Sequence, residues 1–552
     1  MKEIKLFVPM LFLALLLIFG CYKALQTGVK VPVVNVSSEN AKELQVGLEN
    51  KNVNDQLVRT YSNILTFKQQ NLPYLSYKLA GDTKEAIQTA FPRTYTEVDG
   101  VLTFRGNHLR DRPSFGHIPS QASQLSKVWE FTTKRSPDWG GGAGWTGQPA
   151  IIKWGNDVLQ MMNVYDEFKK NPGFVEVVYG SLDGHIYFFD LHSGKPSRPS
   201  INMGNAIRGS VSLDPRGYPL LYVGQGVPQT SKTDIGLRIF SLIDGKQLAM
   251  IKGIDPFAYR RWGAFGGSPL INRKTDTMVV GGENGLLYHI KLHTRFFRDK
   301  KVITVNPFVM KYRYHVKGNL DYGIENSPAA YKNVTWFADN GGSIQAVDMM
   351  TNRPIWALSK TDDTDATIVV DEENGNTPYL YTGTEVDKQG NKGIARLRKL
   401  NGLTGKEIWS TAYPALTVKG KNPVNGGLLA TPVNGKRTIK DLIIYTVARA
   451  PSLETGLMVA LDKQTGKEVW RWRMPKYTWS SPVDIYDEKG KAYILQADAN
   501  GSLYMLSGKD GKIVSKIELG HNVEASPAVY DDMLVVATRA QKIYGVKISG
   551  TP

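Results

Sequence analysis

The chain has 552 residues and carries 68 Lys and Arg against 51 Asp and Glu, a formal net charge of +17. Hydrophobic residues make up 41% of it, and 54 Gly and 28 Pro accompany 26 Tyr and 11 Trp, which excludes a disordered chain and is typical of many short strands separated by turns. The length suits one large closed all-β unit as well as several domains, and the charge favours anionic surroundings without determining the fold.

The first 22 residues indicate export. Lys2 and Lys5 precede an uncharged run, Leu6–Tyr22, that is near the lower limit for a membrane-spanning helix and slightly long for a signal-peptide core. The only cysteine, Cys21, ends this run in a context that resembles the lipobox of bacterial lipoproteins, although Phe19 is bulkier than that motif usually allows. We expect lipidation at Cys21; the alternatives are an uncleaved transmembrane anchor and an ordinary buried cysteine. Either kind of anchor places the protein on the extracytoplasmic side of a membrane.

Residues 23–100 differ in composition from the rest of the chain. A polar stretch leads into Gln56–Gln69, whose apolar residues have a partly helical spacing, and Thr83–Thr89 could add a second short helix. We expect residues 23–100 to form a polar, partly helical stalk. A helical cap packed on the main domain is the alternative.

From Val101 onward the chain repeats one pattern. A small residue followed by proline opens an apolar strand, and the pattern recurs at spacings of roughly 40 to 65 residues, the size of a four-stranded propeller blade with variable loops. Six clear copies and two weaker ones predict eight blades. The copies are Gly147-Gln148-Pro149, Gly267-Ser268-Pro269, Asn326-Ser327-Pro328, Ala430-Thr431-Pro432, Ser480-Ser481-Pro482 and Ala525-Ser526-Pro527, with Gly209-Ser210-Val211 and Asp365-Ala366-Thr367 as the weaker two.

Each predicted blade also carries hairpin signals. Asp-Gly and Asn-Gly turns between alternating apolar residues predict a middle hairpin, and turns such as Thr465-Gly466-Lys467 predict an outer one. After three of the outer turns an aliphatic residue is followed by tryptophan. We expect these tryptophans to pack between neighbouring sheets rather than to contact a ligand. They are Trp356, Trp409 and Trp470.

The combination of an apolar-Tyr strand, an Ala-Leu-Asp-like step, Thr-Gly-Lys and an aliphatic-Trp pair resembles the PQQ-type propeller repeat. This repeat occurs in quinoprotein dehydrogenases and in non-catalytic relatives such as the lipoprotein of the outer-membrane barrel assembly machinery. The resemblance covers Leu102 to Ile548, and Phe104-Arg105-Gly106-Asn107 resembles a segment often found ahead of such propellers. It implies an all-β, eight-bladed propeller of four-stranded antiparallel blades over residues 101–552.

The last blade lacks a strand in this scheme, because only about three strands follow Ala525-Ser526-Pro527. Ser126–Thr132 lies ahead of the first repeat and has the composition of an outermost strand. We expect it to complete the last blade and to close the ring, which would remove exposed sheet edges. The closed propeller is expected to be monomeric.

Catalytic signals are weak. Quinoprotein alcohol dehydrogenases of the resembled family carry a pair of adjacent cysteines over the cofactor, whereas Cys21 is alone, and no stretch matches the cofactor and Ca²⁺ ligands position by position. His289 and His293 are too far apart along a strand to share a metal, and we expect both at the surface. We therefore expect no catalytic residue, no metal and no cofactor, with PQQ and Ca²⁺ only under a dehydrogenase alternative.

Two groups of residues are candidates for binding. Loops that enter the inner strands of a propeller gather around its central channel, and aromatic and charged residues there would suit a peptide or a sugar; ordinary solvated loop residues are the alternative. This channel-mouth group is Trp145, Arg208, Trp262, Glu325, Asp365, Trp479 and Glu524.

The second group is a basic segment interleaved with aromatic residues. On an exported protein it suggests an anionic wall polymer or membrane headgroups rather than nucleic acid, and a merely solvated basic strand pair is the alternative. Its residues are Arg295, Arg298, Lys300, Lys301, Lys311 and Arg313.

The sequence thus predicts an exported, membrane-anchored, non-catalytic propeller that acts as a scaffold for envelope protein or polysaccharide. One alternative is a PQQ- and Ca²⁺-dependent quinoprotein dehydrogenase that oxidises alcohols or sugars. The other is a dedicated cell-wall glycan-binding module.

Overall fold

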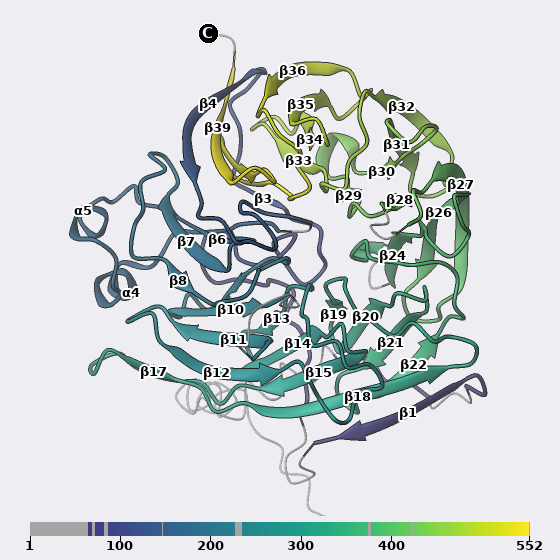
Figure 1. Ribbon diagram of the computed structural model, residues 1–552, viewed down its shortest axis with the longest axis horizontal. Helices are drawn as coiled ribbons and strands as arrows, with labels where there is room; N and C mark the ends of the chain where they lie inside the picture. Colours follow the sequence, from purple (N-terminus) through teal and green to yellow (C-terminus); the bar gives the residue numbers. More distant parts are fainter. Residues whose placement is uncertain are drawn as a thin grey trace, which may run out of the picture. The chain divides into compact units, whose positions relative to one another are not determined.

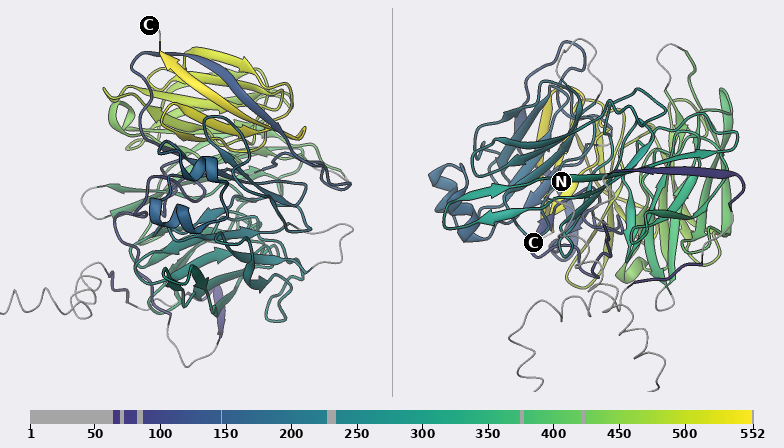
Figure 2. Two further views of the ribbon diagram at one scale, coloured as in Figure 1. Left: turned by 90° about the vertical axis from the view of Figure 1, so that its left-hand side faces the viewer. Right: turned by 90° about the horizontal axis from the view of Figure 1, so that it is seen from below.

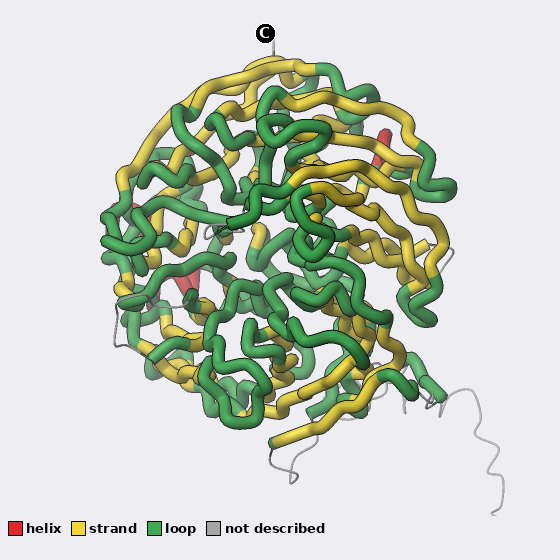
Figure 3. The backbone as a smooth tube through the Cα atoms, turned by 45° about the vertical axis from the view of Figure 1, so that its right-hand side comes forward, coloured by secondary structure: helices red, strands yellow, loops and turns green. Residues whose placement is uncertain are grey.

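The computed structural model describes residues 64–68, 72–81, 87–145, 147–226, 234–373, 377–420 and 424–550. Eight sheets are arranged around a central axis (Figure 1), so the predicted eight-bladed propeller is confirmed. The tube in Figure 3 consists almost entirely of strands and loops. The predicted anchor over residues 1–22, including Cys21, lies outside the described residues.

The first four blades each pair their strands antiparallel. From the inner to the outer strand, blade 1 contains β5 (Ala150–Ile152), β6 (Glu176–Gly180), β7 (His185–Asp190) and β8 (Ile201–Asn202); blade 2 contains β9 (Ser212–Leu213), β10 (Leu220–Gly224), β11 (Gly236–Ser241) and β12 (Gln247–Lys252); blade 3 contains β13 (Leu270–Asn272), β14 (Thr277–Gly281), β15 (Leu286–Lys291) and β18 (Phe308–Val316); and blade 4 contains β19 (Ala329–Tyr331), β20 (Val334–Ala338), β21 (Ile344–Asp348) and β22 (Arg353–Ala357).

The remaining four blades follow the same order. Blade 5 contains β23 (Val369–Glu373), β24 (Thr377–Gly383), β26 (Lys392–Asn401) and β27 (Glu407–Leu416); blade 6 contains β29 (Val433–Asn434), β30 (Leu442–Ala448), β31 (Gly456–Asp462) and β32 (Glu468–Met474); blade 7 contains β33 (Val483–Tyr486), β34 (Ala492–Ala497), β35 (Ser502–Ser507) and β36 (Ile513–Glu518); and blade 8 contains β37 (Ala528–Tyr530), β38 (Met533–Ala537), β39 (Lys542–Gly550) and β4 (Ala122–Thr132).

A few short elements are added to this frame. In the described part of the chain, the α-helices are α4 (Asn156–Met161) and α5 (Asp166–Lys169), which follow β5, and a 3-10 turn covers Arg437–Ile439. Strands β16 (Arg295–Phe297) and β17 (Val302–Thr304) form a separate hairpin, and β25 (Glu385–Val386) pairs with β28 (Gly426–Gly427) beside blade 6. No helix among the described residues has the length and apolar character that crossing a bilayer requires.

Tryptophans pack between the blades, as predicted. The indole N–H of Trp356, Trp409 and Trp470 each donates to a carbonyl oxygen of the next blade, those of Gly402 (2.8 Å), Lys463 (2.9 Å) and Gly508 (3.2 Å). Each ring covers the turn glycine of the next blade so closely that a Cβ on Gly466 would lie 2.6 Å from the ring of Trp409. Trp129 on β4 repeats this arrangement with Leu191 O at 2.8 Å, a fourth wedge that the Val128-Trp129 pair could have revealed.

Blade 8 closes the ring. Strand β4 pairs antiparallel with β39 from Lys542 opposite Thr132 to Gly550 opposite Ala122. The two strands lie side by side in Figure 1 and in the left view of Figure 2, where β4 is blue and β39 is yellow. The predicted closing strand, Ser126–Thr132, is therefore confirmed, and it begins four residues earlier, at Ala122.

The described part of the expected stalk packs on the propeller. Strand β1 (Leu75–Ala80) pairs with β18 at the outer edge of blade 3 (Figure 2, right). Tyr77 stacks there on Tyr312 with ring centroids 5.8 Å apart. Further along, Phe91 and Tyr95 are buried in the cluster between blades 3 and 4. The described residues between 64 and 100 contain no helix, so the expected helical content is not found there. Alternating apolar side chains in Leu75–Ala80 were the signal for a strand.

Residues 100–118, the axial segment, run along the inner edges of the blades. β2 (Gly100–Val101) pairs with β5 of blade 1, and β3 (Ser114–Phe115) pairs with β37 of blade 8. Between and beyond them the segment forms backbone hydrogen bonds with blades 2, 4, 5 and 7. These are Leu213 N to Leu102 O (2.8 Å), Ala330 N to His108 O (2.7 Å), Val370 N to Leu109 O (2.9 Å) and Ile118 N to Tyr486 O (3.0 Å).

Two fully buried arginines of the axial segment bind backbone carbonyl oxygens in four blades, including blades 3 and 6. The Arg105 guanidinium donates to Pro482 O and Pro432 O, in blades 7 and 6. The Arg110 guanidinium donates to Ser268 O (2.8 Å) and Pro328 O (2.9 Å), in blades 3 and 4, and to Phe104 O of its own segment (2.8 Å). Burial lowers the pKa of Arg105 to about 10 and that of Arg110 to about 9, so both stay charged at neutral pH. Together with its backbone bonds, the axial segment thus contacts all eight blades.

Replacing Arg110 by methionine keeps an unbranched side chain but removes the donors to three buried carbonyl oxygens. Each buried acceptor left without a donor costs about 1–3 kcal/mol, so we expect Arg110→Met to lower the free energy of unfolding by roughly 3 kcal/mol or more. Arg112 is exposed in the same segment, and Arg112→Met is the matched control. Thermal and urea unfolding midpoints measure both, and equal midpoints for the two variants would contradict the role of Arg110.

Candidate functional site

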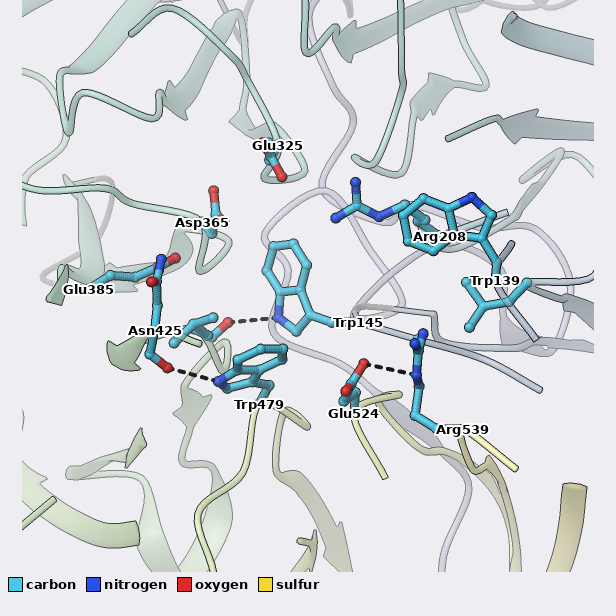
Figure 4. A pocket seen from close by; sticks show the side chains of 13 residues that line it. Trp139, Trp145, Arg208, Glu325, Asp365, Glu385, Asn425, Trp479, Glu524 and Arg539 are labelled. Carbon is cyan, nitrogen blue, oxygen red and sulfur yellow. Dashed lines mark hydrogen bonds and ion pairs between the residues drawn. The ribbon is translucent and has the colours of Figure 1, made fainter. Parts of the chain in front are cut away.

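A cavity of about 280 Å³ opens at the centre of the propeller, and we call it the cup (Figure 4). Most of its wall comes from the loops that precede the inner strands of seven blades, all except blade 3. Because blades are arranged radially, residues far apart in the chain converge there. The side chains that the argument below uses are Trp139, Trp145, Arg208, Glu325, Asp365, Glu385, Asn425, Trp479, Glu524 and Arg539.

Six of the seven residues predicted at the channel mouth line the cup: Trp145, Arg208, Glu325, Asp365, Trp479 and Glu524. Trp262 does not. It lies five residues ahead of the Gly267-Ser268-Pro269 step, is 38% exposed, and its indole N–H donates to Glu283 Oε2 at 2.7 Å. The structure therefore brings together the predicted residues that lie closest to their inner strands.

Sequence reasoning missed four polar or aromatic side chains of the cup. Glu385 and Asn425 belong to the insertion around β25 and β28, which falls outside the repeat pattern, and Arg539 follows β38. Trp139 lies ahead of the glycine-rich stretch Gly140–Gly144 and carried no repeat signal. Since none of the four immediately precedes a small-residue and proline step, only their spatial position reveals them.

Two tryptophan rings in the cup are held by hydrogen bonds. The indole N–H of Trp145 donates to Leu429 O at 3.3 Å, and that of Trp479 donates to Asn425 O at 3.1 Å (Figure 4). Asn425 and Leu429 lie on either side of β28, so the two rings are fixed against the same short segment. A third ring, Trp139, lies under the Arg208 guanidinium at 5.6 Å. The cup therefore presents preformed aromatic surfaces.

Carboxyl groups outnumber arginines in the wall of the cup, although the net charge of the chain is positive. Four carboxyl groups, Glu325, Asp365, Glu385 and Glu524, line it together with two arginines. Arg539 pairs with Glu524 at 3.6 Å. Burial lowers the pKa of the second arginine, Arg208, but the carboxylates of Glu283, Glu325, Asp365 and Glu524 outweigh it and raise the pKa above its ordinary value.

Three carboxyl groups lie together at one part of the cup: Asp365 and Glu385 in its wall, and Asp363 beside it. Oxygens of Asp363, Asp365 and Glu385 all lie within 4.8 Å of one another. Burial raises the pKa of Glu385 to about 8, and burial and the neighbouring carboxylates raise those of Asp363 and Asp365 well above their usual range. Glu385 Oε2 accepts a hydrogen bond from Asn425 Nδ2 at 2.9 Å, whereas no N–H group in the described part of the chain donates to the buried Glu385 Oε1, Asp363 Oδ1 and Asp365 Oδ1. With one proton between them, Glu385 and Asp365 share a hydrogen bond.

The six residues of the predicted basic patch do not form one free surface. Arg295, Arg298, Lys300 and Lys301 are exposed on the β16–β17 hairpin, where Arg298 pairs with Asp157. The other two belong to β18. Lys311 pairs with Asp255 at 2.6 Å, and the Arg313 guanidinium lies 4.4 Å from the ring centroids of Phe257 and Tyr259.

The expectation that His289 lies at the surface is wrong. Its ring is buried between Thr89 Oγ1 (2.7 Å) and Asn352 Oδ1 (2.6 Å), and burial lowers its pKa to about 4. The residue is buried because the segment before the propeller covers blade 3 at this point, which the strand pattern alone did not indicate.

Parts of the chain are similar to known proteins. The family model described as "Outer membrane protein assembly factor BamB" matches residues 454–550. A stretch of 120 residues is 27% identical to methanol dehydrogenase [cytochrome c] subunit 1 of Methylobacterium organophilum, and it spans 22% of this chain but only 16% of that relative.

Two solved structures align with this chain over most of its length. Quinohemoprotein alcohol dehydrogenase from Comamonas testosteroni aligns with a TM-score of 0.55 at 13% identity, over 83% of this chain and 82% of the other. BamB from Moraxella catarrhalis aligns with a TM-score of 0.48 at 17% identity, over 77% of this chain and 99% of the other.

The fold and the cup define the class of protein, a closed eight-bladed β-propeller with a central cavity. Within that class, residues 454–550 are similar to a repeat family described for an outer membrane assembly factor, and a stretch of 120 residues is similar to a methanol dehydrogenase subunit.

The raised pKa of Glu385 makes stability depend on pH. The pKa is about 8 in the folded chain against an ordinary value of 4.5, so the folded state binds more protons and stability falls as pH rises between these values. Glu385→Gln removes this contribution. We expect it to raise the melting temperature at about pH 8.5 and to change it little at about pH 4.5. Exposed Glu488→Gln is the control, and an equal effect of Glu385→Gln at both pH values would contradict the burial of this carboxyl group.

Proposed function

We propose that the chain is an exported, membrane-anchored propeller without catalysis of its own, which acts as an envelope scaffold and binds protein or polysaccharide through the cup. The observation that carries this proposal is the preformed cup with Trp145 and Trp479 fixed in its wall. A concave site with aromatic surfaces and a few converging polar groups is the usual form of a binding site. A ligand can therefore enter without reorganising the propeller.

The dehydrogenase alternative receives less support from the cup. PQQ carries carboxylates and needs cationic partners, whereas four carboxyl groups and two arginines line the cup. One of these arginines, Arg539, already pairs with Glu524. The Asp363, Asp365 and Glu385 oxygens would suit a hard divalent cation, but the carboxylates of the cofactor would still face Glu325 and Glu524. The residues present thus fit PQQ poorly.

The glycan-binding alternative uses the same surfaces. Faces of tryptophan rings suit sugar rings as well as peptide side chains, so Trp145 and Trp479 do not separate the two kinds of partner. We retain polysaccharide as a possible partner of the scaffold and a dedicated cell-wall glycan module as the second alternative.

Envelope capture tests the scaffold. After cross-linking in envelopes, we expect the unmodified chain to recover a protein partner and Trp145→Ala or Trp479→Ala to recover at least about tenfold less, because each variant removes an aromatic wall. Tyr165→Ala is the matched control, since Tyr165 is 45% exposed and does not line the cup. Recovery of wall polymer alone would favour the glycan module. A thermal upshift with PQQ and Ca²⁺, together with dye-linked oxidation of alcohols or sugars, would overturn the scaffold.

Membrane fractionation tests the anchor. The uncharged run up to Tyr22 and the lone Cys21 support lipidation on the extracytoplasmic side. We expect Cys21→Ala to release the protein from the membrane or to mislocalise it, because the acyl chains would be lost. Unchanged retention of Cys21→Ala would instead favour a transmembrane anchor.

A further inference from the structure

We propose that the cup recognises a positively charged organic group, an ammonium or guanidinium, carried by its ligand. The inference rests on the proposed function and names the chemistry of the group that enters the cup. Its starting point is charge. The chain has a net charge of +17, yet carboxyl groups outnumber arginines two to one in the wall of the cup. One of the two arginines is already engaged with Glu524.

Buried acceptors in the wall lack donors. Glu385 is fully buried, lines the cup and accepts from Asn425 through Oε2, and no N–H group among the described residues donates to its Oε1. Oδ1 of Asp365, and Oδ1 of Asp363 beside the wall, likewise have no N–H donor among them. A protonated carboxyl group lets Glu385 and Asp365 share a hydrogen bond, and this bond is lost when both ionise. Buried polar atoms are normally paired, so the ionised oxygens call for donors that come from outside the chain. Ammonium and guanidinium groups supply several N–H donors and the matching charge.

The aromatic wall favours an organic cation. A cation over a tryptophan face is attracted by the ring, and the cup already contains one such pair, Arg208 over Trp139. The rings of Trp145 and Trp479 are fixed through their N–H groups, which leaves their faces to a ligand. A ligand cation between these rings and the carboxyl groups would meet both kinds of partner at once.

A bare divalent cation satisfies fewer of these features. The three carboxyl groups are close enough to share one, but the cavity of about 280 Å³ is much larger than an ion, and tryptophan offers no oxygen ligand. Ca²⁺ is therefore the competing occupant in the test.

Binding of a cation should be linked to proton release. Glu385 faces Asp365, Asp363 and Asn425, and it also feels the charges of Glu325 and Asp387. The cations near this cluster already have carboxylate partners. Lys388 pairs with Asp387 and Asp321 and also partly offsets the rise that burial causes in the pKa of Asp363, and Arg539 pairs with Glu524. Arg208 shares the charges of Glu283, Glu325, Asp365 and Glu524. Burial holds the pKa of Glu385 at about 8, so a ligand cation that requires its ionised form must displace a proton near neutral pH. Affinity should therefore rise between about pH 6 and about pH 8.5.

Calorimetric titration of the purified full chain tests the proposal. The probes are spermidine, a short peptide containing Lys and Arg, the same peptide with acetylated lysine and citrulline in place of arginine, and Ca²⁺ alone. We expect spermidine or the basic peptide to bind with proton release, and the neutralised peptide to bind at least about tenfold more weakly, because its charge-assisted hydrogen bonds are lost. Binding of spermidine alone would identify a free amine as the source of the cation, and preference for the peptide would identify a basic side chain of a protein.

Glu385→Gln separates recognition from folding. This variant should bind the cationic probe at least about tenfold more weakly and without the proton release, whereas Glu488→Gln should bind as the unmodified chain does. Equal binding of the neutralised peptide, or binding of Ca²⁺ with no cationic probe, would overturn the proposal. If no cationic probe binds while capture still depends on Trp145 and Trp479, this inference fails and the scaffold stands. If a cationic probe binds but no partner is captured, the scaffold fails and the inference stands.

Discussion

Hydrogen bonds from two buried arginines to backbone carbonyls hold the centre of this propeller. Arg105 and Arg110 reach carbonyl oxygens in four blades, and three of these oxygens belong to prolines that open inner strands. Burying a guanidinium away from water is costly unless its N–H donors find acceptors, and these carbonyl oxygens accept from both arginines, although Arg105 Nε has no partner among the described residues. The blades must therefore approach the axis at the positions that satisfy them. Neighbouring residues of the axial segment add backbone pairs to the other four blades.

The cup depends on this central arrangement. Its wall residues stand on loops that end where the inner strands begin, so the positions of the blades determine how closely Trp145, Trp479 and Asp365 approach one another. Tryptophan wedges at the periphery, such as Trp409 against Lys463 O, fix the same blades from outside. With the blades fixed at both radii, the cavity is formed before a ligand arrives, and binding need not order the loops.

The local charge of the cup differs from that of the whole molecule. The basic β16–β17 hairpin lies on the outside, with Arg298 and Lys300 exposed, whereas carboxyl groups gather in the cup. Close carboxyl groups cannot all ionise in a buried wall, which is why the pKa values of Asp363, Asp365 and Glu385 are raised together. The net charge of the chain therefore describes its long-range attraction to anionic surroundings, and the charge of the cup is set locally by its own side chains.

The sequence by itself determined the repeats, the inter-blade tryptophans, the closing strand and six residues of the cup. These features depend on local backbone geometry: Gly466, for example, takes the positive φ of +70° that its turn requires, and alternation marks the strands. Only the tertiary structure decided which groups meet across the ring. It placed Glu385 and Asn425 in the cup, left Trp262 outside it, buried His289, divided the basic residues between β18 and a hairpin, and assigned Arg105 and Arg110 to the axis. Such contacts join residues hundreds of positions apart, and they exist only once the ring has closed.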